Sequence, residues 1–262
     1  MAKYTMNRAR SKRRSSIPPD LRLLASRFLA TLLLGLTLVI SNGVMAAEVP
    51  LRAFTASYDL TRSGLKLGTS ELVLEPLEQI WRWRLTTQPS DLLSMFTRKK
   101  PYAETTFIQD RDQMHLLQIL ISDESDSNNI ESASFDWESR QMQVLRKGKR
   151  SSINLATDVY DYQSIHLLAA AMQLQQLNEV IFTFYRKGKL VRSRLVYRGK
   201  GSVKVDDRST NVSIFEQTIS GSKTTVKFSY DLQNPLLPLL IESRKGDDAA
   251  STMTLRKVDW RS

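Results

Sequence analysis

WRWRL, residues 81–85, sets Trp81, Trp83 and Leu85 on one side of the chain and two arginines on the other. Apolar residues at every second position are typical of a β-strand with one buried and one solvated face. Four other stretches share this alternation: residues 54–60, 133–138, 225–232 and 252–256. Because a buried parallel sheet is apolar on both faces, the alternation predicts antiparallel strands.

One stretch breaks the alternation. Residues 157–179 are rich in alanine, leucine and glutamine, and their apolar residues between Ile165 and Met172 recur at helical spacing. Asp158 or Asp161 can cap the start of this helix. The sequence therefore predicts one mainly β domain. We expect a single curved antiparallel sheet that forms an open or spiral β-barrel, with one principal α-helix packed on it.

The four residues RKGK occur twice, at residues 146–149 and 186–189. Each copy lies between two strand-like runs, and Gly148 and Gly188 can adopt the left-handed conformation that a tight hairpin turn requires. Lysine and arginine at such a turn also discourage the edge-to-edge pairing of strands. Nothing in the sequence requires the two turns to lie together. We therefore interpret RKGK as turn chemistry and not as a phosphate-binding motif.

Positive charge gathers at the N-terminus. Residues 1–27 hold eight lysines and arginines against one acid, a net +7 of the +11 of the whole chain, which leaves +4 for the remainder. A charge of this size is ordinary for a soluble domain. No nucleic-acid partner is therefore expected.

A secretory signal peptide explains this charge. An apolar run at residues 28–40 follows the basic region, and small residues at Val44 and Ala46 come next. This order predicts a signal peptide at residues 1–46, cleaved after Ala46, ahead of a single β-rich domain at residues 47–262. An uncleaved membrane anchor is the alternative.

The chain has no cysteine. This excludes a disulfide framework, a thiolate metal site, a cysteine nucleophile and a lipidated cysteine. Combined with the signal peptide, it predicts a soluble periplasmic protein of a Gram-negative bacterium, without a stable membrane span after cleavage.

Motifs for catalysis are weak. His115 and His166 lack a second histidine at metal-binding spacing, and neither a nucleophile elbow, a P-loop nor a dinucleotide fingerprint occurs. Asp206 and Asp207 with Glu216 resemble the paired carboxylates of a hydrolase, but acids beside turns are usually surface residues. We predict no catalytic residue, no metal and no cofactor, and the sequence favours a protein that is not an enzyme.

A basic cluster with apolar neighbours is the predicted ligand site. Its cations suit a lipid headgroup or an anionic glycan, and its apolar side chains suit the rest of such a ligand. The alternative is an exposed loop whose apolar residues cap the core. The predicted ligand-binding residues are Met95, Phe96, Arg98, Lys99, Lys100 and Tyr102.

Four motifs, in order, resemble the bacterial family of domain of unknown function 3108. They are YDL at residues 58–60 with Gly64, Gly68 and Ser70, FDW at residues 135–137, DYQS at residues 161–164, and LPLLIESRKG at residues 237–246. The resemblance runs from about Phe54 to Trp260, although Gln233, Asn234 and Pro235 depart from the family pattern near the end. It implies an exported, β-rich protein and supplies no catalytic residues.

Three functions remain open from the sequence. The first is a non-enzymatic periplasmic protein that binds a hydrophobic or amphipathic envelope component, such as a lipid, or an envelope partner protein. It resembles in outline the half-barrel carriers of lipoproteins, and it predicts a large apolar cavity. The second is a cell-wall or glycan hydrolase with Asp and Glu as acid and base, and the third is a structural assembly factor with a packed interior.

Overall fold

The computed structural model describes residues 49–94, 99–110, 113–123, 126–155, 157–205 and 207–261. The elements up to residue 154 are β1 (Phe54–Arg62), β2 (Leu65–Leu77), β3 (Ile80–Pro89), α2 (Asp91–Ser94), β4 (Pro101–Asp110), β5 (Gln113–Asp123), β6 (Asp126–Asp136), β7 (Gln141–Arg146) and β8 (Lys149–Asn154). The elements that follow are β9 (Val159–Tyr160), α3 (Ile165–Leu174), β10 (Glu179–Arg186), β11 (Lys189–Val205), β12 (Arg208–Ile219), β13 (Thr224–Asp231), β14 (Pro238–Lys245) and β15 (Ser251–Trp260).

The strands of the described residues form one sheet, in the order β8-β7-β6-β5-β4-β3-β2-β1-β15-β14-β13-β12-β11-β10-β9. Its first and last strands in the chain meet in the middle, where Phe54 of β1 pairs with Trp260 of β15. Neighbouring strands are antiparallel except β9, which is parallel to β10. Among these residues β8 and β9 are the two edges and do not pair with each other. The sheet is therefore open, which confirms the fold predicted from the sequence.

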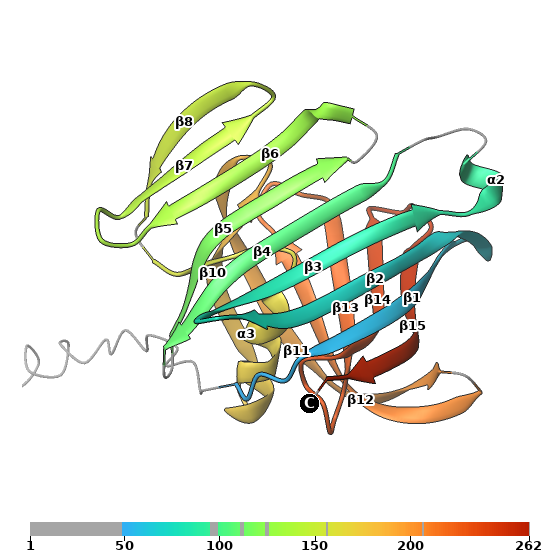
Figure 1. Cartoon of the computed structure of the whole chain (residues 1–262). Coiled ribbons are helices and arrows are strands. Elements are labelled where there is room, and N and C mark those ends of the chain that lie inside the picture. Colours follow the sequence, from blue (N-terminus) through green and yellow to red (C-terminus); the bar gives the residue numbers. More distant parts are fainter. Residues whose placement is uncertain are drawn as a thin grey trace, which may run out of the picture. The chain divides into compact units, whose positions relative to one another are not determined.

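The sheet curves around α3. Figure 1 shows β2 to β6 on one side of this helix and β11 to β14 on the other. Every residue from Ile165 to Met172 is buried. The ring of His166 on α3 has its centroid 5.6 Å from that of Trp83 on β3 and 5.7 Å from that of Phe228 on β13. The helix thus packs on the concave face, against strands from both halves of the sheet.

The helix is shorter than the sequence predicts, because the residues ahead of it form β9 and pair with the middle of β10. Asp161 makes the turn between the two elements. Its Oδ1 accepts hydrogen bonds from the backbone N–H groups of Gln163, at 3.2 Å, and Ser164, at 2.8 Å. These bonds direct the chain into α3, which begins at Ile165. In the part of the chain described here, no helix has the length and apolar character to cross a membrane.

The alternation of WRWRL is confirmed in β3. Trp83 is fully buried, and Trp81 and Leu85 pack against the core. Arg82 points to the opposite face, where its Nη2 lies 2.6 Å from Oε1 of Glu75. The inner face of the sheet is therefore apolar and the outer face polar, as an antiparallel sheet allows.

Both RKGK copies are hairpin turns, as the sequence predicted. Lys147 and Gly148 join β7 to β8 with φ angles of 50° and 72°, and Lys187 and Gly188 join β10 to β11 with φ angles of 52° and 72°. Positive φ at both central residues is the geometry of the two-residue turn that matches the twist of the flanking strands.

Candidate functional site

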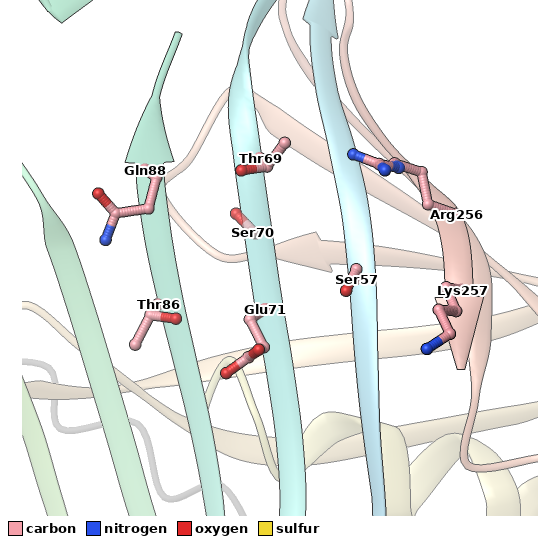
Figure 2. A pocket seen from close by; sticks show the side chains of 8 residues that line it. All are labelled: Ser57, Thr69, Ser70, Glu71, Thr86, Gln88, Arg256 and Lys257. Atoms are coloured by element: carbon pink, nitrogen blue, oxygen red, sulfur yellow. The ribbon is translucent and has the colours of Figure 1, made fainter. Parts of the chain in front are cut away.

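A pocket on the outer face of the sheet is the candidate site. It has a volume of about 390 Å³, within the range of about 300–1,000 Å³ that is usual for small-molecule sites. Figure 2 shows the side chains that line it, on β15, β1, β2 and β3 at the centre of the sheet. They are Ser57, Thr69, Ser70, Glu71, Thr86, Gln88, Arg256 and Lys257.

Strand register places all of the lining side chains of β1, β2 and β3 except Ser70 on one face. Ser57 of β1 pairs with Glu71 of β2, and Glu71 pairs with Thr86 of β3. Cross-strand partners point to the same side of a sheet, and their neighbours along each strand point to the other. Because Tyr58 and Leu72 are buried on the inner face, the three polar side chains stand on the outer face.

A β-bulge adds two cations to the pocket. Ser57 pairs with Lys257 and Tyr58 with Leu255, so Arg256 is the extra residue of β15. In a regular strand, two consecutive side chains point to opposite faces, and a bulge removes this constraint. Arg256 and Lys257 are both exposed, and Figure 2 shows both reaching from β15 toward β1.

The charged groups of the pocket are only weakly engaged. Nη1 of Arg256 lies 3.8 Å from Oδ1 of Asp59, an oxygen that Lys66 already approaches at 2.7 Å. Nζ of Lys257 lies 2.8 Å from Oδ2 of Asp259. Ion pairs this exposed contribute little to stability, so both cations can turn to an incoming anion. With Glu71 as the carboxylate, the lining has a net charge of +1.

The hydroxyl and amide groups beside the cations suit a ligand with many hydroxyls. Ser57, Thr69 and Thr86 can each donate and accept a hydrogen bond, and Gln88 can do both through its amide. Ser70 pairs with the buried Tyr58, so its side chain points to the inner face, where its Oγ is 2.8 Å from Oγ1 of Thr87. The arrangement can therefore bind a saccharide that also carries a phosphate or a carboxylate.

Three residues of the cluster predicted from the sequence, Lys99, Lys100 and Tyr102, are described by the structure. Met95, Phe96 and Arg98 fall outside the described residues, and Lys99 is exposed. The backbone N–H of Lys100 donates to Oδ1 of Asp123 at 2.9 Å.

Tyr102, the last residue of that cluster, is held on β4. Its hydroxyl donates to Oε2 of Glu104 at 2.5 Å. Burial, together with this bond to a carboxylate, raises the pKa of Tyr102 to about 12. None of the described residues of the predicted cluster lines the pocket.

The carboxylates considered for hydrolysis are far apart. Asp206 lies outside the described residues, and Asp207 is exposed at the turn between β11 and β12. Glu216 lies in the middle of β12 and accepts a hydrogen bond from Arg198 at 2.5 Å. At about 3.3 Å per residue along a strand, Glu216 is too distant from the turn to share a cleft with Asp207.

The two histidines have no part in the pocket. Nδ1 of His166 lies 2.8 Å from the hydroxyl of Tyr230, and burial lowers the pKa of His166 to about 3. His166 is thus a neutral interior residue that joins α3 to β13. His115 lies on β5, where its ring packs 4.9 Å from that of Trp137.

One feature of the sequence indicates the pocket: the apolar alternation of β15 changes its phase. Apolar residues of β15 fall at Met253 and Leu255, and then at Val258 and Trp260. The phase of the alternation therefore changes at Arg256 and Lys257. Such a phase change inside a strand is the sequence pattern of a β-bulge, and bulges are frequent at binding sites.

Comparison with known proteins gives the family and the fold. The family described as "Protein of unknown function (DUF3108)" matches residues 54–255, so the chain belongs to it. No curated protein sequence matches the chain. A β-barrel-like protein of domain of unknown function DUF1849 from Brucella abortus is 13% identical, with a TM-score of 0.55 over 82% of this chain and 100% of that one. The hypothetical lipoprotein YmcC from Escherichia coli is 12% identical, with a TM-score of 0.31 over 93% of this chain and 98% of that one.

Proposed function

We propose that this member of the DUF3108 family is a non-enzymatic periplasmic binding protein. In this proposal it recognises the polar, anionic part of an amphipathic envelope component, a phosphorylated or acidic saccharide, through the outer-face pocket. The observation that carries the proposal is the bulge of β15, which sets Arg256 and Lys257 side by side above a row of hydroxyl groups and Glu71.

The position of α3 on the concave face favours the outer face of the sheet as the binding surface. α3 lies against the concave face, and the buried aromatic side chains of Trp83, Phe228 and Tyr230 surround His166. A carrier that encloses acyl chains needs an apolar space that side chains do not fill. An amphipathic ligand is therefore expected to bind here through its headgroup.

The pocket argues against the hydrolase alternative. Hydrolysis of a glycosidic bond by two carboxylates requires them about 5–10 Å apart on either side of the bond. Among the residues that line the pocket, Glu71 is the one carboxylate. The pocket thus supplies groups for binding and lacks the second acid for this chemistry.

Export to the periplasm rests on the signal-peptide pattern of residues 1–46. Its test is direct. After expression in a Gram-negative host, the protein is purified from the periplasmic fraction and its N-terminus is sequenced. Cleavage after Ala46 supports the proposal. A protein that stays in the membrane fraction with an intact N-terminus would instead favour the anchored alternative.

Binding is tested by calorimetry with N-acetylglucosamine 1-phosphate as the probe and N-acetylglucosamine as its neutral counterpart. We expect the phosphorylated sugar to bind more tightly. The variant R256A/K257A should lose about ten- to a hundredfold in affinity, because charge-assisted hydrogen bonds are the strong ones. The control is R244A/K245A, which removes the same two side chains from an exposed site at the end of β14.

Native mass spectrometry of the purified protein with envelope extracts extends this test to unknown ligands. A bound acidic saccharide or glycolipid that R256A/K257A no longer retains supports the proposal. Equal retention by both variants would contradict the pocket as the site. A protein that binds nothing in either assay favours the assembly factor, for which a packed interior is sufficient.

A further inference from the structure

The two RKGK turns lie together in space, although forty residues separate them in the sequence. The backbone N–H of Gly188 donates to Oε1 of Glu131 on β6 at 3.0 Å, and Nε of Arg146 donates to Oε2 of the same carboxylate at 2.6 Å. A Cβ atom added to Gly188 would lie 3.0 Å from Cδ of Arg146. No pattern in the sequence predicts that the two turns approach each other.

Glu131 holds the two turns together. Its side chain is only 14% exposed, and both of its carboxylate oxygens are engaged. Burial, together with the charge of Glu131, raises the pKa of the neighbouring Tyr185. The carboxylate of Glu131 therefore accepts hydrogen bonds from Arg146 and Gly188 within the contact. It does not pair with the exposed lysines of the turns.

The lysines of the two turns, and Arg150 directly after the first turn, face solvent, whereas Arg186 is half-buried. Neither turn contains an acidic residue. Five exposed side chains have no ion pair with any residue that the structure describes. They are Lys147, Lys149, Arg150, Lys187 and Lys189.

We propose that these five cations form a docking surface for a membrane that contains anionic phospholipids. We call them the basic double turn. Hairpin turns are convex, so they offer their charges to an extended surface and do not enclose a small ion. One lysine or arginine near an anionic membrane strengthens binding about fivefold. Several cations held together by a shared carboxylate can therefore act jointly, without ordering a loop at the moment of binding.

This surface is separate from the outer-face pocket. The pocket lies on β15, β1, β2 and β3, whereas the basic double turn joins β7 to β8 and β10 to β11, toward the two edges of the sheet. Docking would bring a binding protein to the membrane that carries its ligand. The membrane would be a second binding partner of the protein, and its binding does not depend on the identity of the pocket's ligand.

The test is vesicle flotation with the full chain, in the form in which the expressing cell processes it. One set of vesicles contains phosphatidylglycerol and phosphatidylcholine, and the other contains phosphatidylcholine alone. We expect binding to the anionic vesicles only, and it should weaken as sodium chloride rises from about 0.05 to 0.5 M, because salt screens exposed charges. Equal binding to both vesicles, or binding that salt does not weaken, would overturn the proposal.

The decisive variant is K147Q/K149Q/K187Q/K189Q, which we expect to bind anionic vesicles at least about tenfold more weakly. Its control is K200Q/K204Q/K223Q/K245Q, which changes four exposed lysines elsewhere and should keep its binding. Any contribution of the N-terminal segment is common to both. Equal binding by the two variants would overturn the proposal, provided that their circular dichroism and thermal unfolding match.

Two further measurements distinguish membrane docking by the basic double turn from a phosphate site and from vesicle binding through the pocket. Binding to soluble inositol hexakisphosphate without binding to anionic vesicles would indicate a phosphate site and overturn membrane docking. R256A/K257A should still bind the vesicles, since its changes lie in the pocket. Its loss of vesicle binding would overturn the basic double turn as the membrane contact, whatever the sugar-phosphate titration shows.

Discussion

The inner and outer faces of the same sheet differ in what they do. Trp83, Tyr58 and Tyr230 are fully buried on the inner face. Some polar groups there are bonded to one another, as His166 is to Tyr230, whereas the indole N–H of Trp83 has no partner among the described residues. The outer face carries ion pairs, such as that of Arg82 with Glu75, and the pocket. The difference indicates that most of the stability comes from the inner face, and the recognition that we propose uses the outer one.

Removal of the largest buried side chain of the inner face should have the largest effect on stability. Trp83 is fully buried, and the centroid of its ring lies 5.6 Å from the ring centroids of Phe54 and His166. W83A should lower the free energy of unfolding by about 3–5 kcal/mol, because a cavity remains where the ring was. Chemical denaturation followed by circular dichroism measures this change.

Two variants serve as controls for that measurement. Q88A removes an exposed side chain from the same strand, β3, and should change the free energy of unfolding by less than about 0.5 kcal/mol. W83F keeps most of the ring and removes an indole N–H that is buried without a hydrogen-bond partner among the described residues. It should cost much less than W83A. Equal costs for W83A and Q88A would contradict the division between the two faces.

The fold was predictable because the inner face imposes a simple pattern on the sequence. A strand that packs one side against a core must alternate, and WRWRL, Ala133–Trp137 and the strand at residues 225–232 all do so. The central helix was predictable for the same reason, from the spacing of its apolar residues. Its start was not. Val159 and Tyr160 were included in it, and only the parallel pairing with β10 makes them a strand.

The pocket and the contact between the two RKGK turns were less predictable, because they depend on contacts between distant parts of the chain. The bulge at Arg256 left a local signal, the phase change in β15, but the pocket also needs β1, β2 and β3 beside it. The approach of the two RKGK turns left no local signal at all. It depends on Glu131, a residue in neither turn.

The dependence of stability on pH tests whether the polar groups of the inner face are shielded from solvent. Burial lowers the pKa of His166 to about 3, whereas an unfolded histidine has a pKa of 6.5. Below pH 6.5 the unfolded chain therefore binds a proton that the folded chain does not. The stabilisation is fully present above pH 6.5 and is lost as the pH falls toward 3. By pH 5 the loss should be about 2 kcal/mol.

The contribution of His166 is isolated by comparing the protein with H166Q across this range. Asp161 works in the opposite direction, since burial raises its pKa above 3.8. Its stabilisation is present below that value and is lost as the pH rises through the raised pKa. Because both proteins contain Asp161, the difference between their pH profiles belongs to His166. Identical profiles would mean that the ring is open to solvent.

The contact through Glu131 lies on the inner side of the sheet, because Val144 and Arg146, two residues apart on β7, point to the same face and both lie near Gly188. E131A leaves the guanidinium of Arg146 and the N–H of Gly188 without this acceptor. It should cost about 1–3 kcal/mol in the free energy of unfolding. E131Q, which keeps an acceptor for the N–H, should cost less. Hydrogen exchange at Gly188 reads out the local opening, which should be faster in E131A than in E131Q.

The two RKGK turns can be compared directly, glycine by glycine, since they have the same sequence and the same backbone geometry. Gly148 and Gly188 both have a φ of 72°. A Cβ at Gly148 would meet no atom within 4 Å, whereas one at Gly188 would lie 3.0 Å from Cδ of Arg146 and 3.4 Å from Cγ1 of Val144. G148A should therefore cost only the backbone strain, about 1–2 kcal/mol.

G188A should cost about 1 kcal/mol more, because Arg146 must move away from its hydrogen bond to Glu131. The difference between the two variants cancels the strain that they share and leaves the contact between the turns. The double variant G188A/E131A supplies the check. Once Glu131 is absent, Arg146 can move without losing a bond, so the extra cost of G188A should shrink. If the extra loss of unfolding free energy in G188A stays the same, the added methyl group is resisted by Val144 and not by the hydrogen bonds to Glu131.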